Sequence, residues 1–100
     1  EGTYLGAVAT IGAAVSFENA GDSAEALGLY QELVDEYEDD SSYTPRALFN
    51  AGRIGEQQDN IAEAVESYNR LMDDYPTSSW TNLARNRIIT LTVEGRIGEE

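Results

Sequence analysis

The sequence predicts an all-α fold of five helices arranged as antiparallel pairs, and three observations support this prediction. The segment AEALGLY at residues 24–30 recurs as AEAVESY at residues 62–68, so the chain repeats itself. Apolar residues within each copy follow the spacing of an amphipathic helix. The short turns NAGD and QQDN separate the helical segments, and turns of this length make neighbouring helices run antiparallel. Two helix pairs and one further helix are therefore expected.

The first helix of each pair is expected over residues 3–19 and 43–57. In the second of these segments Pro45 falls in the first turn, where its missing N–H costs nothing. The residues predicted to line the buried face of this helix are Ala47, Ala51, Ile54 and Gly55. Their predicted counterparts in the earlier helix are Ala9, Ala13, Ala14 and Phe17.

The second helix of each pair is expected within residues 21–38 and 59–76, which carry the repeated segment. One apolar stripe comprises Ala26, Tyr30, Leu33, Val34 and Tyr37, and the other comprises Ala64, Tyr68, Leu71, Met72 and Tyr75. Each helix start carries the N-cap and N3 residues of a capping box, Asp22 with Glu25 and Asn60 with Glu63. Both copies are thus predicted to begin and to bury their faces in the same way.

A fifth helix is expected to begin at Ser78 or Ser79, directly after Pro76, and to continue through residues 80–91. Its buried stripe is predicted to comprise Trp80, Ala84, Ile88 and Leu91. The acidic tail 93–100 contains two glycines and is expected to be flexible, so residues 1–92 are assigned to one helical domain.

Small residues are predicted to mark the helix crossings. Ala26 and Ala64 lie where the second helix of each pair crosses the first, and Ala14 and Gly52 are expected opposite them. Gly52 and Gly55 each cost about 1 kcal/mol of helix propensity relative to alanine. Close approach of another helix is the expected compensation.

The composition excludes several classes of function. With 19 acidic residues, six basic residues and a net charge of −13, the chain repels nucleic acid and anionic membrane surfaces. No segment has the length of apolar sequence that membrane insertion requires. All six basic residues are arginines, and the acidic surface is interpreted either as ordinary solubility or as adaptation to high salt.

No catalytic, metal or cofactor site is predicted. The chain contains no Cys and no His, which removes the thiol nucleophile, the usual general base and the commonest metal ligands. No phosphate-binding glycine loop or nucleophile elbow is present. The paired acids within 37–42 and 72–76 lack the ligand spacing of a calcium loop and are interpreted as solvated surface. The sequence therefore predicts a non-enzymatic protein.

Arginines and amides concentrate on the first helices of the pairs and on the fifth helix. One polar stripe comprises Arg46, Asn50, Arg53 and Gln57, and a second comprises Leu83, Asn86, Arg87 and Thr90, with Phe49 beside the first. Guanidinium and amide groups that converge from two helices suit carboxylates and peptide backbone. The alternative is that these are ordinary exposed polar positions.

The residue types and spacing of the two copies resemble those of the tetratricopeptide repeat. The residues that carry this resemblance are Gly21, Ala26, Tyr30 and Leu33, their counterparts Asp59, Ala64, Tyr68 and Leu71, and Pro76. The resemblance implies a superhelix with one repeat at about 3–38, a second at about 43–76 and a further helix at about 78–92. It also implies that the first helices line a concave binding face. The phrases VDEYEDDSSYTPRALFNAG and MDDYPTSSWTNLARN are similar to repeats of bacterial envelope proteins, such as the Tol-Pal coordinator and outer-membrane assembly lipoproteins. This similarity implies a place in the periplasm or cell envelope.

The predicted function is a protein-interaction module within a larger protein. Its groove is expected to hold a partner segment with acidic side chains or a terminal carboxylate, bound by Arg46, Phe49, Asn50, Arg53, Asn86 and Arg87. The alternative is a structural module that stacks on neighbouring repeats or forms a homodimer. That alternative rests on additional apolar residues in the first helix, namely Tyr4, Leu5, Val8, Ile11 and Val15.

Overall fold

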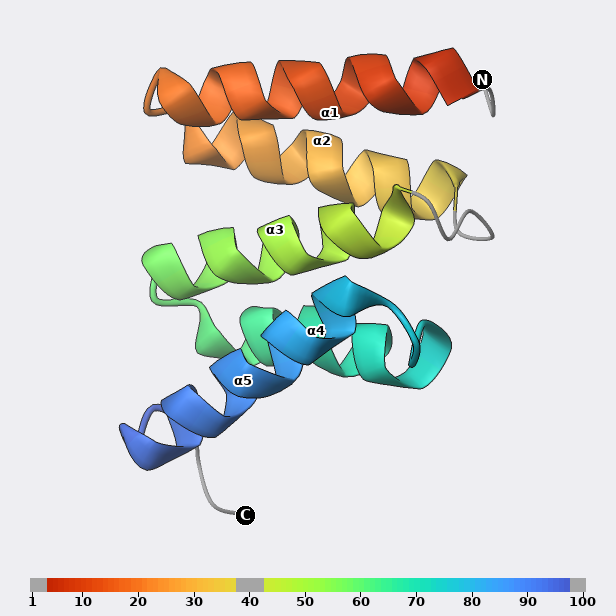
Figure 1. The fold of residues 1–100 in the computed structure, drawn as a ribbon. Helices are drawn as coiled ribbons and strands as arrows, with labels where there is room; N and C mark the ends of the chain where they lie inside the picture. Colours follow the sequence, from red (N-terminus) through yellow and green to blue (C-terminus); the bar gives the residue numbers. More distant parts are fainter. Residues whose placement is uncertain (1–3, 38–42, 98–100) are drawn as a thin grey trace.

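The computed structural model describes residues 4–37 and 43–97, and five α-helices make up the described fold. In chain order these are α1 (Tyr4–Asn19), α2 (Ser23–Glu36), α3 (Thr44–Gln57), α4 (Ile61–Asp74) and α5 (Ser79–Val93). The helices stack in sequence from α1 at one end of the molecule to α5 at the other (Figure 1). Each helix packs against the next, and α3 also contacts α5. The predicted all-α architecture of paired helices is confirmed.

The two pairs turn in the same way although their turn residues differ. Gly21 has a positive φ of 86°, and Asp59 occupies the matching turn with a φ of 62°. Aspartate tolerates this left-handed conformation better than most residues with a side chain. Asp22 caps α2 by accepting a hydrogen bond from the backbone N–H of Glu25, whereas Asn60 makes no side-chain cap bond to α4. At α2 only the N-cap half of the predicted capping box therefore forms, because the N–H of Asp22 donates to the carbonyl of Phe17, and at α4 no side-chain cap bond forms.

The later boundaries agree with the sequence. Pro45 lies in the first turn of α3, and Ser78 caps α5 by accepting a hydrogen bond from Trp80 N at 3.1 Å. Each of these helices also begins near a buried threonine. Thr44 Oγ1 donates to the carbonyl of Tyr37, and Thr81 Oγ1 donates to the carbonyl of Tyr75 at 2.5 Å. The hydroxyl of each threonine thus satisfies a carbonyl at the end of an earlier helix.

The core contains most of the apolar positions that the helical spacing predicted. All five predicted positions in α2 and its C-cap are buried, and so are all four predicted positions in α3. In α4, three of the predicted positions are buried. Met72 and Tyr75 are half-buried. In α5, Ala84 and Leu91 are buried, and Trp80 and Ile88 pack against the core while partly exposed.

The prediction for α1 is wrong in its register. Ala14 is buried as expected, but Ala9, Ala13 and Phe17 are exposed, and the other core residues of α1 are Ala7 and Ile11. The prediction transferred the buried face of α3 to α1. However, α3 packs against α2, α4 and α5, whereas α1 packs chiefly against α2. In α3, one face is covered by α2. The corresponding face of α1 is exposed in the described structure.

This correction reduces the apolar surface assigned to the first helix. Ile11 belongs to the core and Val15 packs against it, so neither is surplus surface. Val8 is 40% exposed. The side chains of Tyr4 and Leu5 lie outside the described residues.

Close approach of α3 and α4 explains both glycines of α3. A Cβ added at Gly52 would lie 2.4 Å from Cε1 of Tyr68. A Cβ added at Gly55 would lie 3.3 Å from the Cβ of Ala64. The glycine nearest to Ala64 is thus Gly55, and Gly52 faces Tyr68 one turn further along the crossing.

Ala64→Leu is expected to lower the free energy of unfolding by about 1–3 kcal/mol. Ala64 is fully buried at the crossing, so a leucine there must push against the backbone of α3 around Gly55. Chemical denaturation measures the change. The exposed Ala62 is the control, because Ala62→Leu meets solvent and should alter stability by less than about 0.5 kcal/mol. Equal stability of the two variants would contradict the helix pairing.

The chain after α5 makes specific contacts as far as it is described. Gly95, with a φ of 76°, donates to the carbonyl of Thr92, and Arg96 N donates to the carbonyl of Leu91. These two bonds form a Schellman motif. Arg96 Nη2 also donates to the carbonyl of Glu56 at 3.3 Å, and Ile97 packs against the core. Residues 98–100 of the predicted flexible tail lie outside the described residues, and the flexibility of the tail stays a prediction.

Candidate functional site

The candidate site lies on the face shared by α1, α3 and α5, which we call the A face. Because successive residues of a helix are about 100° apart, Arg46, Asn50 and Arg53 lie on one side of α3, as the stripe predicted. Leu48 and Ala51 lie on the opposite side. Side-chain bonds from α3 to both α1 and α5 cross the A face.

Glu18 of α1 joins three helices at one end of the A face. Its Oε2 accepts a 2.6 Å bond from Arg53 Nη2 of α3, and its Oε1 accepts a 3.2 Å bond from the Tyr30 hydroxyl of α2. Asn50 Oδ1 accepts from Arg53 Nη2 at 3.0 Å and from Nε at 3.3 Å. Asn50 Nδ2 in turn donates to the carbonyl of Arg46. Arg53 is therefore held in one orientation by its own helix and by α1.

Glu56 of α3 repeats this arrangement with the next helices. Its Oε2 accepts from the Tyr68 hydroxyl at 2.6 Å and from Arg87 Nε at 3.0 Å. Its Oε1 accepts from Arg87 Nη2 at 2.5 Å. Glu56 is 9% exposed, whereas Arg87 is 39% exposed. Each Tyr–Glu–Arg set therefore ties together the two helices of one pair and the first helix of the next.

These contacts shift the ionisation of the groups involved. Burial raises the pKa of Glu56, but the hydrogen bonds from Arg87 and Tyr68 more than offset it, so the net pKa lies below its ordinary value. Burial and the charge of Glu18 raise the pKa of Tyr30 to about 12. Burial and the hydrogen bond to Glu56 raise the pKa of Tyr68 as well. At neutral pH Glu56 is therefore anionic, and both tyrosines keep the proton that they donate.

The remaining predicted residues surround these two sets. Phe49 is half-buried, with its ring centroid 5.8 Å from that of Tyr68 and 5.5 Å from that of Trp80. Asn86 is exposed, and Arg46 is half-buried with no carboxylate partner in the described part of the chain. The structure thus brings Arg46, Phe49, Asn50 and Arg53 together on α3 and places Asn86 and Arg87 on α5.

The sequence reasoning missed the two glutamates that engage the arginines. The repeat itself contained a signal for these contacts. Glu18 and Glu56 occupy matching positions near the ends of α1 and α3, and Tyr30 and Tyr68 occupy matching positions within α2 and α4. Their effect is to neutralise Arg53 and Arg87 internally. The A face is consequently less basic than the count of its arginines indicates.

The carboxylates of α2 and α4 have fewer such partners. Within these two helices, Arg70 is the one basic residue, and its Nε lies 3.6 Å from Asp74 Oδ2. The other acids of the two helices form no ion pair in the residues that the structure describes, and they are Glu25, Glu32, Asp35, Glu36, Glu63, Glu66 and Asp73. The negative charge of the protein is thus least compensated on these helices.

The midpoint of thermal unfolding is expected to rise when NaCl is raised from about 0.1 M to about 1 M, because the Debye length falls from about 10 Å to about 3 Å. Screening then relieves the repulsion within a chain of net charge −13. It also weakens the Glu56–Arg87 pair, but a nearly buried carboxylate is screened much less than exposed ones. A flat or falling midpoint would contradict a dominant role of repulsion and, with it, adaptation to high salt. Chloride is the appropriate anion, since sulfate strengthens burial in any protein.

Neither a metal-binding cluster nor a membrane-spanning helix is found among the described residues. No group of three or more His, Cys, Asp or Glu side chains within the described ranges could hold a metal ion. None of the five helices is both long and apolar enough to cross a membrane, as far as the described residues show.

Comparison with known proteins agrees with the fold of paired helices. A family model described as tetratricopeptide repeat matches residues 12–40 and again residues 46–78. A TPR repeat-containing protein of Treponema pallidum (strain Nichols) is 33% identical over 88 residues, which cover 83% of this chain and 37% of that protein. The chain thus spans well under half of this relative's length. No solved structure matches the chain. Because the family model matches most of the sequence in two consecutive copies, the chain belongs to the tetratricopeptide repeat family.

Proposed function

We propose that this domain is a non-catalytic interaction module that holds a segment of a partner protein on the A face. Tetratricopeptide repeats bind proteins or peptides and are typically non-enzymatic. The observation that carries the proposal is the incomplete use of the A-face arginines. Within the described residues, Arg46 has no carboxylate partner, and Nη1 of Arg53 and of Arg87 makes no hydrogen bond.

The free donors favour a partner segment that carries carboxylates. Arg46 lies in the first turn of α3, where the helix dipole adds to its positive charge. Among the described residues, the A face bears three arginines against two glutamates, and it therefore has one surplus positive charge in an otherwise acidic protein. An acidic side chain or a terminal carboxylate suits this position.

The paired residues prepare the surface for this partner. Glu18 and Glu56 fix the orientation of Arg53 and Arg87, so that binding does not have to order these long side chains. Asn50 orients Arg53, and Asn86 offers an exposed amide to a peptide backbone. Phe49 offers the exposed part of its ring as an apolar anchor.

The proposed setting is a larger protein of the bacterial cell envelope. Support comes from the similarity of the two loop-and-helix phrases to repeats of envelope proteins, and from a relative that is longer than this chain. Fractionation of the source cells, followed by detection of the intact protein, tests this setting. Recovery in the cytosolic fraction would contradict it.

Peptides selected by display against the domain test the proposed binding face. We expect the selected sequences to carry acidic residues or a required C-terminal carboxylate. Arg46→Ala should weaken their binding by about 1.5–3 kcal/mol if the contact is desolvated. The matched control is Arg85→Ala on α5, because Arg85 is exposed and bonds to Asn82, and this loss should stay below about 1 kcal/mol. Equal losses in the two variants would place the site elsewhere.

Self-association through α1 is the alternative function, and one observation favours it. Val8 and Phe17 are exposed apolar residues of α1, at 40% and 38%. Light scattering over a range of concentrations separates the two functions. A molar mass that stays that of the monomer contradicts self-association, whereas a dimer that Val8→Gln disrupts supports it.

A further inference from the structure

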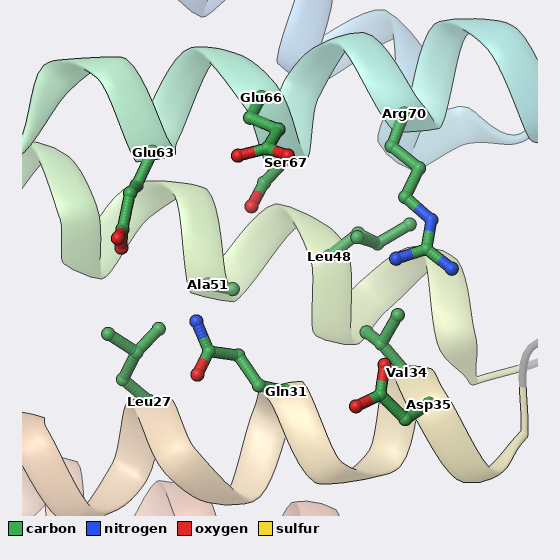
Figure 2. A pocket seen from close by; sticks show the side chains of 10 residues that line it. All are labelled: Leu27, Gln31, Val34, Asp35, Leu48, Ala51, Glu63, Glu66, Ser67 and Arg70. Atoms are coloured by element: carbon green, nitrogen blue, oxygen red, sulfur yellow. The ribbon is translucent and has the colours of Figure 1, made fainter.

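A cleft opens on the side of the molecule opposite the A face, between α2 and α4. Its floor is α3, against which both helices pack (Figure 2). We call it the outer cleft. Its volume is about 320 Å³, and its apolar lining comprises Leu27 and Val34 of α2 with Leu48 and Ala51 of α3. Leu48 and Ala51 lie on the side of α3 that faces away from Arg53, so the outer cleft and the A face are separate surfaces.

The size of the outer cleft limits what it can hold. Pockets for small ligands have volumes of about 300–1,000 Å³, and the outer cleft is at the lower end of this range. It can therefore enclose one or two side chains of a bound segment and not a whole helix. Its floor is formed by Leu48 and Ala51, core residues that are only 3% and 5% exposed, and the half-buried Leu27 of α2 is the more accessible apolar residue of its lining.

Carboxylates flank this apolar floor. Asp35 comes from α2, and Glu63 and Glu66 extend from α4 toward the cleft (Figure 2). None of the three forms an ion pair or a side-chain hydrogen bond in the part of the chain that the structure describes. Arg70 is the one base among the described lining residues, and it is paired with Asp74.

The acidic residues of the A face differ from those of the outer cleft in their ion-pair partners. There the acids Glu18 and Glu56 each receive an arginine from another helix. Around the outer cleft, like charges face one another with little compensation, which is unfavourable for the isolated domain. A cationic occupant would remove this repulsion and form new ion pairs.

We infer that the outer cleft docks a short basic segment of a partner protein. One apolar side chain of this segment rests on Leu48 and Ala51, and its lysines or arginines meet Asp35, Glu63 and Glu66. A second copy of this chain is a poor occupant, because two proteins of net charge −13 repel each other. This inference goes beyond binding at the A face, since it assigns a second surface and a partner of opposite charge.

The experiment uses two fluorescent peptides, one with a central leucine between lysines and one in which glutamates replace the lysines. Fluorescence anisotropy at low salt measures binding to the wild-type domain. We expect the lysine peptide to bind and the glutamate peptide not to bind at the outer cleft. The double variant Glu63→Gln and Glu66→Gln should weaken the lysine peptide about tenfold.

The matched control removes the same number of negative charges from exposed positions that do not line the outer cleft. Glu25 and Glu32 are exposed on α2 and do not line the cleft, so the double variant Glu25→Gln and Glu32→Gln should change affinity less than about twofold. Circular dichroism verifies that both double variants keep their helices. Equal weakening by the two double variants would overturn the inference, because it would show attraction to overall charge.

Amide chemical shifts locate the bound peptide independently of affinity. Binding in the outer cleft should perturb the signals of Gln31 and Ser67, which line it, and leave that of Asn86 on α5 unchanged. Perturbation of Asn86 alone, or no binding of the lysine peptide, would overturn the inference. The result is separate from the test of Arg46, so either proposal can fail while the other stands.

Discussion

Gly52→Ala is expected to destabilise the domain by about 1–3 kcal/mol, although alanine is the better helix former by about 1 kcal/mol. A Cβ at this position would lie 2.4 Å from Cε1 of Tyr68 and 2.8 Å from its Cδ1 and Cζ. The ring has no free space to move into, because Tyr68 is fully buried and its hydroxyl is bonded to Glu56. The backbones of α3 and α4 must therefore separate, and the cost exceeds the gain in helix propensity.

Gly28 provides a matched control for this prediction. It also lies within a helix, but a Cβ there would meet no atom within 4 Å. Gly28→Ala should therefore stabilise the domain by about 0.5–1 kcal/mol. Denaturation with urea measures both variants under the same conditions. If Gly52→Ala is as stable as Gly28→Ala, the contact between α3 and Tyr68 is not formed in solution.

Glu56→Ala is expected to lower the free energy of unfolding by about 2–3 kcal/mol. The change removes the acceptor of the Tyr68 hydroxyl and the counter-ion of Arg87 in one step. A fully buried pair would lose about 3–5 kcal/mol. The loss is smaller here because Arg87 is 39% exposed and can turn toward water. The control is Glu32→Ala, which removes an exposed acid and should change stability by less than about 0.5 kcal/mol.

The contribution of Glu56 should also depend on pH. Its pKa in the folded protein is below its ordinary value of 4.5, so folding favours the anionic form. The stabilisation is therefore complete above the ordinary value and is lost as the pH falls through the folded-state pKa. Unfolding of the wild type and of Glu56→Gln, measured between neutral and acidic pH, should show a stability difference that shrinks on acidification. A constant difference would mean that the carboxylate is not held by Arg87 and Tyr68.

Much of the fold could be predicted because the same pattern of apolar residues occurs in two copies of the repeat. Ala26 and Ala64, Tyr30 and Tyr68, and Leu33 and Leu71 are all fully buried, as their shared spacing predicted. Helical periodicity is reliable in these segments because a polar face opposes each apolar one. In α1, alanine and glycine occur on every side, so periodicity alone did not distinguish the buried side from the exposed one.

The candidate site was predicted less completely for a related reason. The stripe of Arg46, Asn50 and Arg53 lies on one side of α3, as a rule about helix geometry requires. The partners of Arg53 and Arg87 are 35 and 31 residues away in sequence. Pairing over such distances depends on how the helices stack, which no local pattern contains. The outer cleft likewise went unpredicted, because residues of three separate helices, α2, α3 and α4, line it.

The sequence by itself determined the helices, most of their buried faces and the position of the repeat, because helix geometry and burial of apolar side chains act over a few turns of one segment. It also determined that the acids gather on α2 and α4. Only the tertiary structure decided which charges are compensated. Arg53 and Arg87 bind Glu18 and Glu56, whereas Asp35, Glu63 and Glu66 form no ion pair with any described residue around the outer cleft. The physical reason is that an ion pair requires two side chains within about 4 Å, and only the packing of separate helices brings them that close.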